Sequence, residues 1–234
     1  FRQLAQTEKL TALGKLAAGI AHEINNPLSN VSLNVEMLRQ ELLGIPSLPD
    51  AEKRIGIIER NIARASNIAK ELLDFARQRE ANLQPADLNA LIRSTLTLLG
   101  NRRQEYRITP ELPKLPPIMA DSCKVEEVLL NVLLNAMEAS VPGGSIELRT
   151  HSQGAEIVVE IIDHGSGITP EDLPRVMEPF FTTKDVGKGT GLGLSICHSI
   201  MEMHGGRIEL TGTAGGGTTV SLSFLPAPEG VRHG

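Results

Sequence analysis

The sequence has no tryptophan, and aromatic residues make up only 3% of its 234 residues. Aromatic side chains form the stacking surfaces of proteins that bind single-stranded nucleic acid, and a basic face attracts the phosphate backbone. This chain instead carries a net charge of −5. The composition therefore argues against nucleic-acid binding.

Long hydrophobic runs are also missing. No apolar stretch approaches the roughly 20 residues that a membrane-spanning helix needs, and no signal peptide precedes the first predicted helix. We therefore expect no membrane contact from this sequence and a cytoplasmic location for it. Phe1 falls inside a helical pattern without a start signal, so we expect the sequence to be cut from a longer protein, whose membrane anchoring is left open.

Cysteine is scarce as well, with Cys123 and Cys197 the two copies. Two cysteines at this separation make neither a disulfide framework nor a metal-binding motif. We expect buried free thiols in a reducing compartment. Hydrophobic residues, at 41%, are abundant enough for a substantial core.

Glycine and proline are rare in the first third of the chain. Residues 1–80 hold four of the 22 glycines, and apolar residues recur every three or four positions on either side of a Gly- and Pro-containing break at 44–50. This pattern predicts two long helices in an antiparallel hairpin over residues 1–82. The apolar faces are too wide for one hairpin to bury, so we expect a homodimer with a four-helix bundle.

Three polar residues lie on the first predicted helix, away from its apolar stripe. Ile20 and Ile24 belong to that stripe, so His22, two residues from each, projects away from it. Glu23 is its neighbour, and Asn26 lies one turn further along the same exposed face. From the residues alone, a solvated histidine beside a solvated glutamate is the alternative to a functional group.

The second domain, predicted over residues 83–230, alternates short helices and strands without a regular βαβ rhythm. We therefore expect an α+β fold in which this part is an α/β sandwich, with a mixed sheet and helices on one face. Thr169-Pro170-Glu171-Asp172 has the composition of a further helix start. The other predicted helices run from Asp87 to about Leu99, from Asp121 to about Ala139 and from Gly193 to His204. The predicted strands are 106–108, 118–120, 145–152, 157–162, 207–211 and 218–225.

Two asparagines lie one turn apart on the helix that starts at Asp121. Asn131 and Asn135 are poor helix-interior residues, because their side chains compete for backbone hydrogen bonds. Their oxygens suit a hydrated Mg²⁺, and a pair of solvent-facing amides is the alternative.

Two glycine clusters adjoin predicted elements. Asp163, Gly165 and Gly167 follow a β-branched strand, and a second cluster, at 189–193, opens a helix. Glycines let the backbone turn sharply and approach a ligand, and free N–H groups at a helix start attract phosphate. Either cluster alone is typical of an ordinary turn, but together they indicate a nucleotide pocket. We expect residues 178–188 to form a mobile flap from which Lys184 and Lys188 could reach phosphate.

Five ordered motifs resemble those of the catalytic core of bacterial two-component sensor histidine kinases, in the branch that includes nitrogen-regulation sensors. They are the H box (His22–Leu28), the N box (Asn131–Ala136), the first glycine box (Asp163–Gly167), the F box (Glu178–Phe181) and the second glycine box (Gly189–Leu194). Gly217-Thr218-Thr219 resembles the last nucleotide-contacting turn of the family.

The resemblance implies ATP and Mg²⁺ as cofactors and an aspartate on a response regulator receiver domain as the final acceptor. His22 would accept the γ-phosphoryl group, Glu23 would act as its base, and Asn26 would position water for dephosphorylating the regulator. Asn135 and Asn131 would bind Mg²⁺, and Asp163 would hydrogen-bond the adenine amino group. The remaining implied nucleotide contacts are Gly165, Gly167, Ile168, Phe180, Lys184, Gly189, Thr190, Gly191, Leu192, Gly193, Leu194 and Thr218.

Other functions compete with a kinase. The second half also resembles the gyrase, Hsp90 and mismatch-repair ATPases, which lack an H-box hairpin before the pocket. A dimeric scaffold in which nucleotide only sets conformation, and an ATPase that releases phosphate to water, are two further hypotheses. Intact acceptor, base and glycine boxes favour the histidine kinase, with response-regulator phosphatase activity through Asn26.

Overall fold

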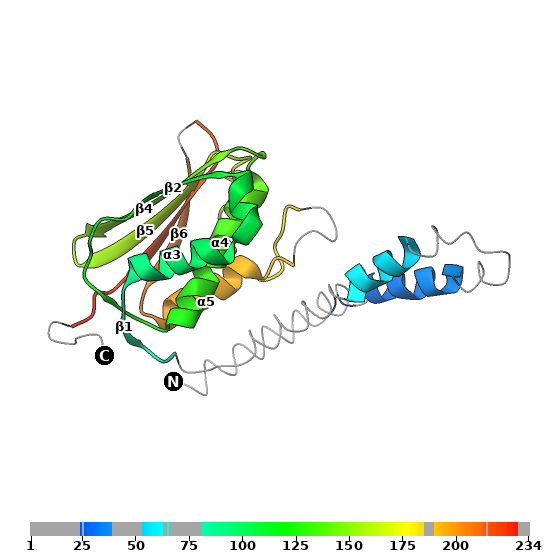
Figure 1. Cartoon of the computed structure of the whole chain (residues 1–234), viewed down its shortest axis with the longest axis horizontal. Helices are drawn as coiled ribbons and strands as arrows, with labels where there is room; N and C mark the ends of the chain where they lie inside the picture. The colour runs from blue at the N-terminus through cyan, green and yellow to red at the C-terminus, as the bar shows by residue number, and fades with distance from the viewer. Residues whose placement is uncertain are drawn as a thin grey trace. The chain divides into compact units, whose positions relative to one another are not determined.

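The computed structural model describes residues 24, 26–38, 53–62, 65, 81–184, 190–213 and 215–228. The chain divides into two compact units, Phe1–Arg79 and Glu80–Gly234 (Figure 1). Within the described residues, no helix has both the length and the apolar character to cross a membrane.

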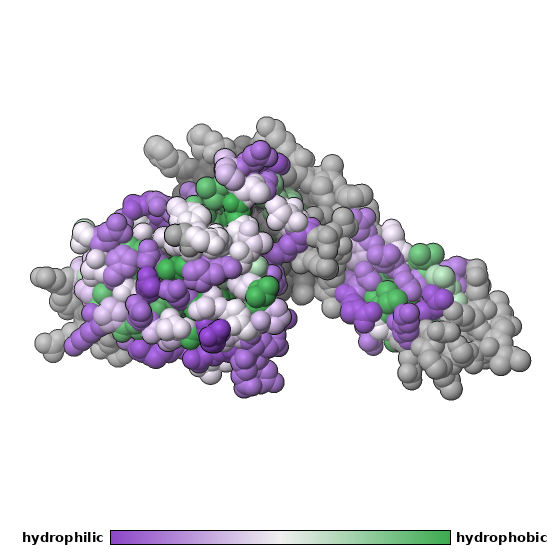
Figure 2. Space-filling model, turned by 90° about the horizontal axis from the view of Figure 1, so that it is seen from above, coloured by the Kyte–Doolittle hydropathy of each residue, from purple (hydrophilic) through white to green (hydrophobic). Residues whose placement is uncertain are grey.

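The first unit contains a pair of helices. Residues 26–38 and 53–62 are helical, and the two segments meet where the Arg54 guanidinium donates a hydrogen bond to Met37 Sδ at 3.2 Å. Several apolar side chains of the pair stay on the surface (Figure 2). They are Leu28, Leu33, Val35, Met37, Ile55 and Ile62, of which Leu33 is 58% exposed. Within the described residues of this helical pair, one chain therefore leaves part of the apolar surface uncovered.

The second unit is built on a five-stranded mixed sheet of order β2-β4-β5-β7-β6. Its strands are β2 (Arg107–Glu111), β4 (Ser145–Gln153), β5 (Glu156–Asp163), β6 (Arg207–Gly212) and β7 (Thr218–Phe224). β2 and β4 are parallel and the other neighbours antiparallel. A small antiparallel sheet pairs β1 (Gln84–Ala86) with β3 (Ile118–Ala120). The predicted mixed sheet is confirmed.

Three helices of the described chain cover one face of the five-stranded sheet (Figure 1). They are α3 (Leu88–Leu98), α4 (Ser122–Ala139) and α5 (Gly193–Met203), with a 3₁₀ helix, η1 (Gly100–Glu105), after α3. Alternate residues of the central strands, such as Ile146, Leu148 and Leu222, are fully buried beneath the helices. Each such side chain contributes about 1.5–3 kcal/mol relative to an exposed position, so this layer anchors the unit.

Side-chain caps define where two helices begin. The Asp87 carboxylate accepts hydrogen bonds from Asn89 N and Ala90 N at the start of α3, and Asp121 accepts from Lys124 N at the start of α4. Both predicted helix starts are confirmed. His204 joins the end of α5 to this second cap, since its Nε2 accepts from Asp121 N at 3.0 Å.

The predicted helix start at Thr169 is wrong. Thr169 does cap a turn, accepting from Asp172 N through Oγ1 and from Leu173 N through its carbonyl, but residues 170–177 form successive turns. Pro174 explains the failure, because proline has no N–H to continue the helix and its ring clashes with the carbonyl four residues earlier. Strand β1 was not predicted either, since a three-residue strand containing proline gives almost no periodic signal.

Cys197 lies between α5 and α4. It is fully buried, and its Sγ lies 4.0 Å from the carbonyl oxygen of Val128. Burial, reinforced by the nearby Glu127 charge, raises the pKa of the Cys197 thiol from 9.0 to about 12. Thiolate is the form that reacts with thiol reagents. Cys197 is therefore protected from modification both because it is buried and because its thiol stays protonated.

We therefore expect a chromogenic disulfide reagent at pH 8 to label Cys123, which is exposed, and to spare Cys197 until the chain is unfolded. The measurement is the number of thiols released before and after adding guanidinium. Cys123→Ser should leave no reactive thiol in the native protein. Rapid native labelling of that variant would contradict the packing of α5 against α4.

Candidate nucleotide-binding site

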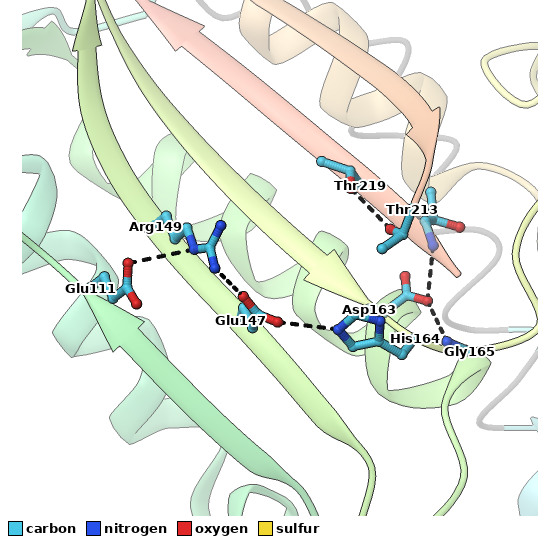
Figure 3. A network of polar contacts seen from close by, with 9 residues as sticks. Glu111, Glu147, Arg149, Asp163, His164, Gly165, Thr213 and Thr219 are labelled. Carbon is cyan, nitrogen blue, oxygen red and sulfur yellow. Dashed lines mark hydrogen bonds and ion pairs between the residues drawn. The ribbon is translucent and has the colours of Figure 1, made fainter. Parts of the chain in front are cut away.

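The Asp163 carboxylate lies at the end of β5 and is only 3% exposed. Its Oδ1 accepts two backbone hydrogen bonds, one from Gly165 N at 2.9 Å (Figure 3) and one from Thr218 N at 3.1 Å. No donor from the described part of the chain reaches Oδ2. A buried carboxylate oxygen without a donor is costly, so this atom is suited to receive a hydrogen bond from a ligand.

A glycine allows the β6–β7 turn to close on this carboxylate. Gly217 has φ +102°, and a Cβ there would lie 2.1 Å from the carbonyl oxygen of Asp163. Gly167 packs against the same turn, since a Cβ on it would lie 3.2 Å from Gly217 O. Ile168 follows and is half-buried. The turn residues 215–217 and the loop after β5 therefore form one wall of the proposed site.

The loop after β5 is also fixed to α4. Ser166 N donates to the carbonyl oxygen of Ala139, the last residue of α4, at 3.1 Å. A Cβ on Gly165 would lie 2.3 Å from that same oxygen. This contact brings the Asp163 loop beside the end of α4, which carries the two predicted asparagines.

The N-terminus of α5 has no side-chain cap. The first intrahelical hydrogen bond in this turn runs from Ile196 N to Leu192 O, and no acceptor among the described residues meets the N–H groups of Gly193 and Leu194. Leu192 is fully buried beneath the turn, where its N–H donates to Thr190 Oγ1 at 3.4 Å. Free N–H groups at the positive end of a helix dipole are suited to bind an anion.

Phe180 and Gly191 hold two predicted motifs together. Phe180 N donates to Gly191 O at 2.9 Å, and a Cβ on Gly191 would lie 2.4 Å from Phe180 C, so only glycine allows this approach. Among the described residues, Phe180 is the one non-glycine residue with positive φ, at 68°. Such backbone strain costs on the order of 1–3 kcal/mol and persists where the surroundings enforce it, often at functional sites.

The asparagines of α4 face the start of α5 and the segment after Phe180. Asn131 Oδ1 lies 3.9 Å from where a Cβ on Gly193 would be. Asn135 Oδ1 accepts from Lys184 Nζ at 3.3 Å, and the same ammonium pairs with the Glu138 carboxylate. The described residues contain no cluster of three or more His, Cys, Asp or Glu side chains that could hold a metal ion.

A row of charged side chains runs from the site across the outer face of the sheet. His164 contacts Glu147, Glu147 contacts Arg149, and Arg149 contacts Glu111 (Figure 3). These side chains come from two adjacent strands, β2 and β4, and from the loop after β5. They are largely exposed, so the row contributes little to stability.

Most of the predicted nucleotide residues are thus brought together. Asp163, Gly165, Gly167 and Thr218 form one end of the site, and Asn131, Asn135, Lys184 and Gly193 lie along α4 and the start of α5. Asn26 lies in the helical segment 26–38 of the first unit and is half-buried. His22, Glu23, Gly189 and the flap residues 185–188 lie outside the described residues.

Sequence reasoning assigned no role to Glu138 or Cys197, although both lie beside predicted site residues. Spacing in the sequence could have identified them, since Glu138 is three residues after Asn135 and Cys197 is four residues after Gly193. Side chains at these separations share a helix face.

Comparisons with known proteins agree with this geometry. Residues 12–81 match the model of the His Kinase A (phospho-acceptor) domain, and residues 120–229 match that of the histidine kinase-, DNA gyrase B- and HSP90-like ATPase. The sensor histidine kinase ZraS of Escherichia coli K12 is 36% identical over 96% of this chain and 48% of that protein. AtoS, a signal transduction histidine-protein kinase of the same organism, is 35% identical over 98% of this chain and 37% of that protein.

Solved structures show the same architecture. Histidine kinase ThkA, in a complex with the response regulator protein TrrA, superposes with a TM-score of 0.79 and is 27% identical over 96% of this chain and 65% of that one. The separate catalytic domain of ThkA is 30% identical, with a TM-score of 0.57, and 98% of it is covered by 63% of this chain. This chain spans about half or less of the length of the curated relatives above. It belongs to the two-component sensor histidine kinases, as a catalytic core in which a phospho-acceptor domain precedes an ATPase domain.

Proposed function

We propose that the chain is an ATP-dependent protein kinase that phosphorylates its own His22 and passes the phosphoryl group to an aspartate of a response regulator. The observation that carries the nucleotide half of this proposal is the buried Asp163 carboxylate, whose Oδ2 has no donor among the described residues. We assign residues 1–82 to dimerisation and phosphotransfer, and residues 83–230 to ATP binding.

The described residues fit an adenine nucleotide with Mg²⁺. Oδ2 of Asp163 is an acceptor for the adenine amino group, and Gly165, Gly167, Ile168 and Thr218 shape the surrounding pocket. The uncapped start of α5 and Lys184 offer positive charge to the phosphates. We also include Phe180 and residues 189–194 among the proposed nucleotide contacts. The oxygens of Asn135 and Asn131 would hold Mg²⁺, which neutralises phosphate charge when bound.

The protein's chemical task is to supply a nucleophile and to hold it in line with the phosphorus–oxygen bond that breaks. A ring nitrogen of neutral His22 attacks the γ-phosphorus, and the bond from that phosphorus to the β–γ bridging oxygen breaks, which leaves ADP. The Glu23 carboxylate stabilises the positive charge that develops on the imidazole. The phosphoryl group then moves from His22 to a carboxylate oxygen of the regulator. Catalysis of this kind depends on positioning and charge neutralisation.

We propose two partners, a second copy of this chain and a response regulator. The exposed apolar residues of the helical pair support the first, because a four-helix bundle would cover them. The comparison structure of ThkA with the regulator TrrA supports the second. We further propose that the Asn26 amide orients a water molecule for dephosphorylating the regulator.

Incubating the purified chain with γ-labelled ATP and Mg²⁺ tests the kinase assignment. We expect acid-labile, base-stable label on the wild type and none on His22→Gln, because only an imidazole forms the phosphoramidate. Equal labelling of both proteins would make His22 the wrong acceptor. Nucleotide binding without any label would favour a scaffold, and undiminished ATP turnover by His22→Gln would favour an ATPase that releases phosphate to water.

Asn26→Ala tests the phosphatase assignment separately. We expect autophosphorylation within about twofold of wild type, because the amide is not part of the nucleophile, and regulator dephosphorylation at least about tenfold slower, within the range for one positioning group. The measurement is the decay of labelled regulator with ADP and each variant present. Wild-type decay rates with Asn26→Ala would overturn the role of Asn26 and leave the kinase assignment intact.

A further inference from the structure

Lys184 contacts two residues of α4 at once. Its ammonium lies 3.3 Å from Asn135 Oδ1 and forms an ion pair with Glu138, and these two residues are three positions apart on one helix face. The contacts join segments 46–49 residues apart in the chain. Glu138 has no role in the function proposed above, yet its carboxylate pairs with Lys184, which we assign to the phosphates.

The position of this ammonium conflicts with the proposed roles of its neighbours. Asn135 Oδ1 is the oxygen that we assign to Mg²⁺, and Lys184 is a cation that we assign to the phosphates. A Mg²⁺ ligand lies about 2 Å from the ion, so the divalent cation and the ammonium would be within a few ångströms of each other on one oxygen. Repulsion between them favours moving Lys184 off Asn135.

We propose that Glu138 is a positioning residue that holds Lys184 on Asn135 in the absence of nucleotide, and that this contact is exchanged when nucleotide and Mg²⁺ bind. This inference rests on the nucleotide-binding role proposed above. In the loaded protein, the ammonium leaves Glu138 and Asn135 for the phosphates. The Glu138–Lys184 pair therefore opposes nucleotide binding and sets how much nucleotide is needed to fill the site.

The exposure of the pair sets the size of the effect. The side chains of Lys184 and Glu138 are 37% and 49% exposed, so solvent screens their attraction. Exposed ion pairs contribute little to stability, and losing one changes an equilibrium by about two- to fivefold. A weak pair suits an exchange of this kind, because it adds only a small barrier to filling the site.

The test is a double-mutant cycle on nucleotide affinity with the full chain. Calorimetric titration with a non-hydrolysable ATP analogue and Mg²⁺ measures binding without phosphoryl transfer. We expect Glu138→Gln to bind about two- to fivefold more tightly than wild type, because the competing pair is gone. In a Lys184→Met background the same substitution should give no such gain. Glu138→Asp, which keeps the charge, should stay close to wild type.

A charge-matched control separates this pair from general electrostatics. Glu126, on the same helix, has no ion pair within the described residues, and Glu126→Gln removes one negative charge from α4 without touching Lys184. Weaker binding by Glu138→Gln, or the same gain in the Lys184→Met background, would overturn the inference. Asp163→Asn tests the underlying nucleotide-binding proposal separately. If Asp163→Asn loses nucleotide binding but the effects of Glu138→Gln and Lys184→Met are additive, the nucleotide-binding proposal stands and only the exchange is wrong.

Discussion

The hydrogen bonds on Asp163 hold the second unit's site together. One carboxylate oxygen takes N–H groups from the loop after β5 and from the first residue of β7, so Asp163 is joined to a residue 55 positions further along the chain. The other oxygen, Oδ2, has no donor among the described residues and is therefore available to a ligand. Because the carboxylate is buried, the two backbone donors offset part of the cost of removing its charge from water. Residue 217 must be glycine here, because a Cβ on Gly217 would lie 2.1 Å from the carbonyl oxygen of Asp163.

The helices then place charge-binding groups around that carboxylate. The last residue of α4 accepts a hydrogen bond from the loop after β5, so the C-terminal end of α4 lies beside the loop that carries Asp163. Across from it, the uncapped start of α5 presents backbone N–H groups, and the Phe180–Gly191 contact holds the preceding turn against it. The sheet, the end of α4 and the start of α5 thus each contribute donors or acceptors to the proposed site, with the proposed base contact at Asp163 and the proposed phosphate contacts at the start of α5.

Sequence alone predicted the parts whose signal is local. The caps at Asp87 and Asp121 follow from carboxylates placed before apolar periodicity, and the β-branched run before Asp163 marks β5. The helix expected at Thr169 failed because Pro174 overrides a good cap. Contacts between distant segments had no local signal. Neither the Lys184–Glu138 pair nor the approach of Gly217 to Asp163 is visible in spacing, since each depends on how loops cross over the packed sheet.

The central claim is that the free oxygen of Asp163 selects adenine, and the most direct test is the affinity of Asp163→Asn for ADP and GDP by calorimetry. The amide keeps an acceptor for Gly165 and Thr218 but turns an NH₂ group toward the ligand's amino donor. We predict that the variant stays folded and loses at least about tenfold in ADP affinity, the size expected for one charged hydrogen bond, together with the wild type's preference for ADP over GDP. An Asp163→Asn chain that binds ADP as tightly and as selectively as wild type would contradict the account.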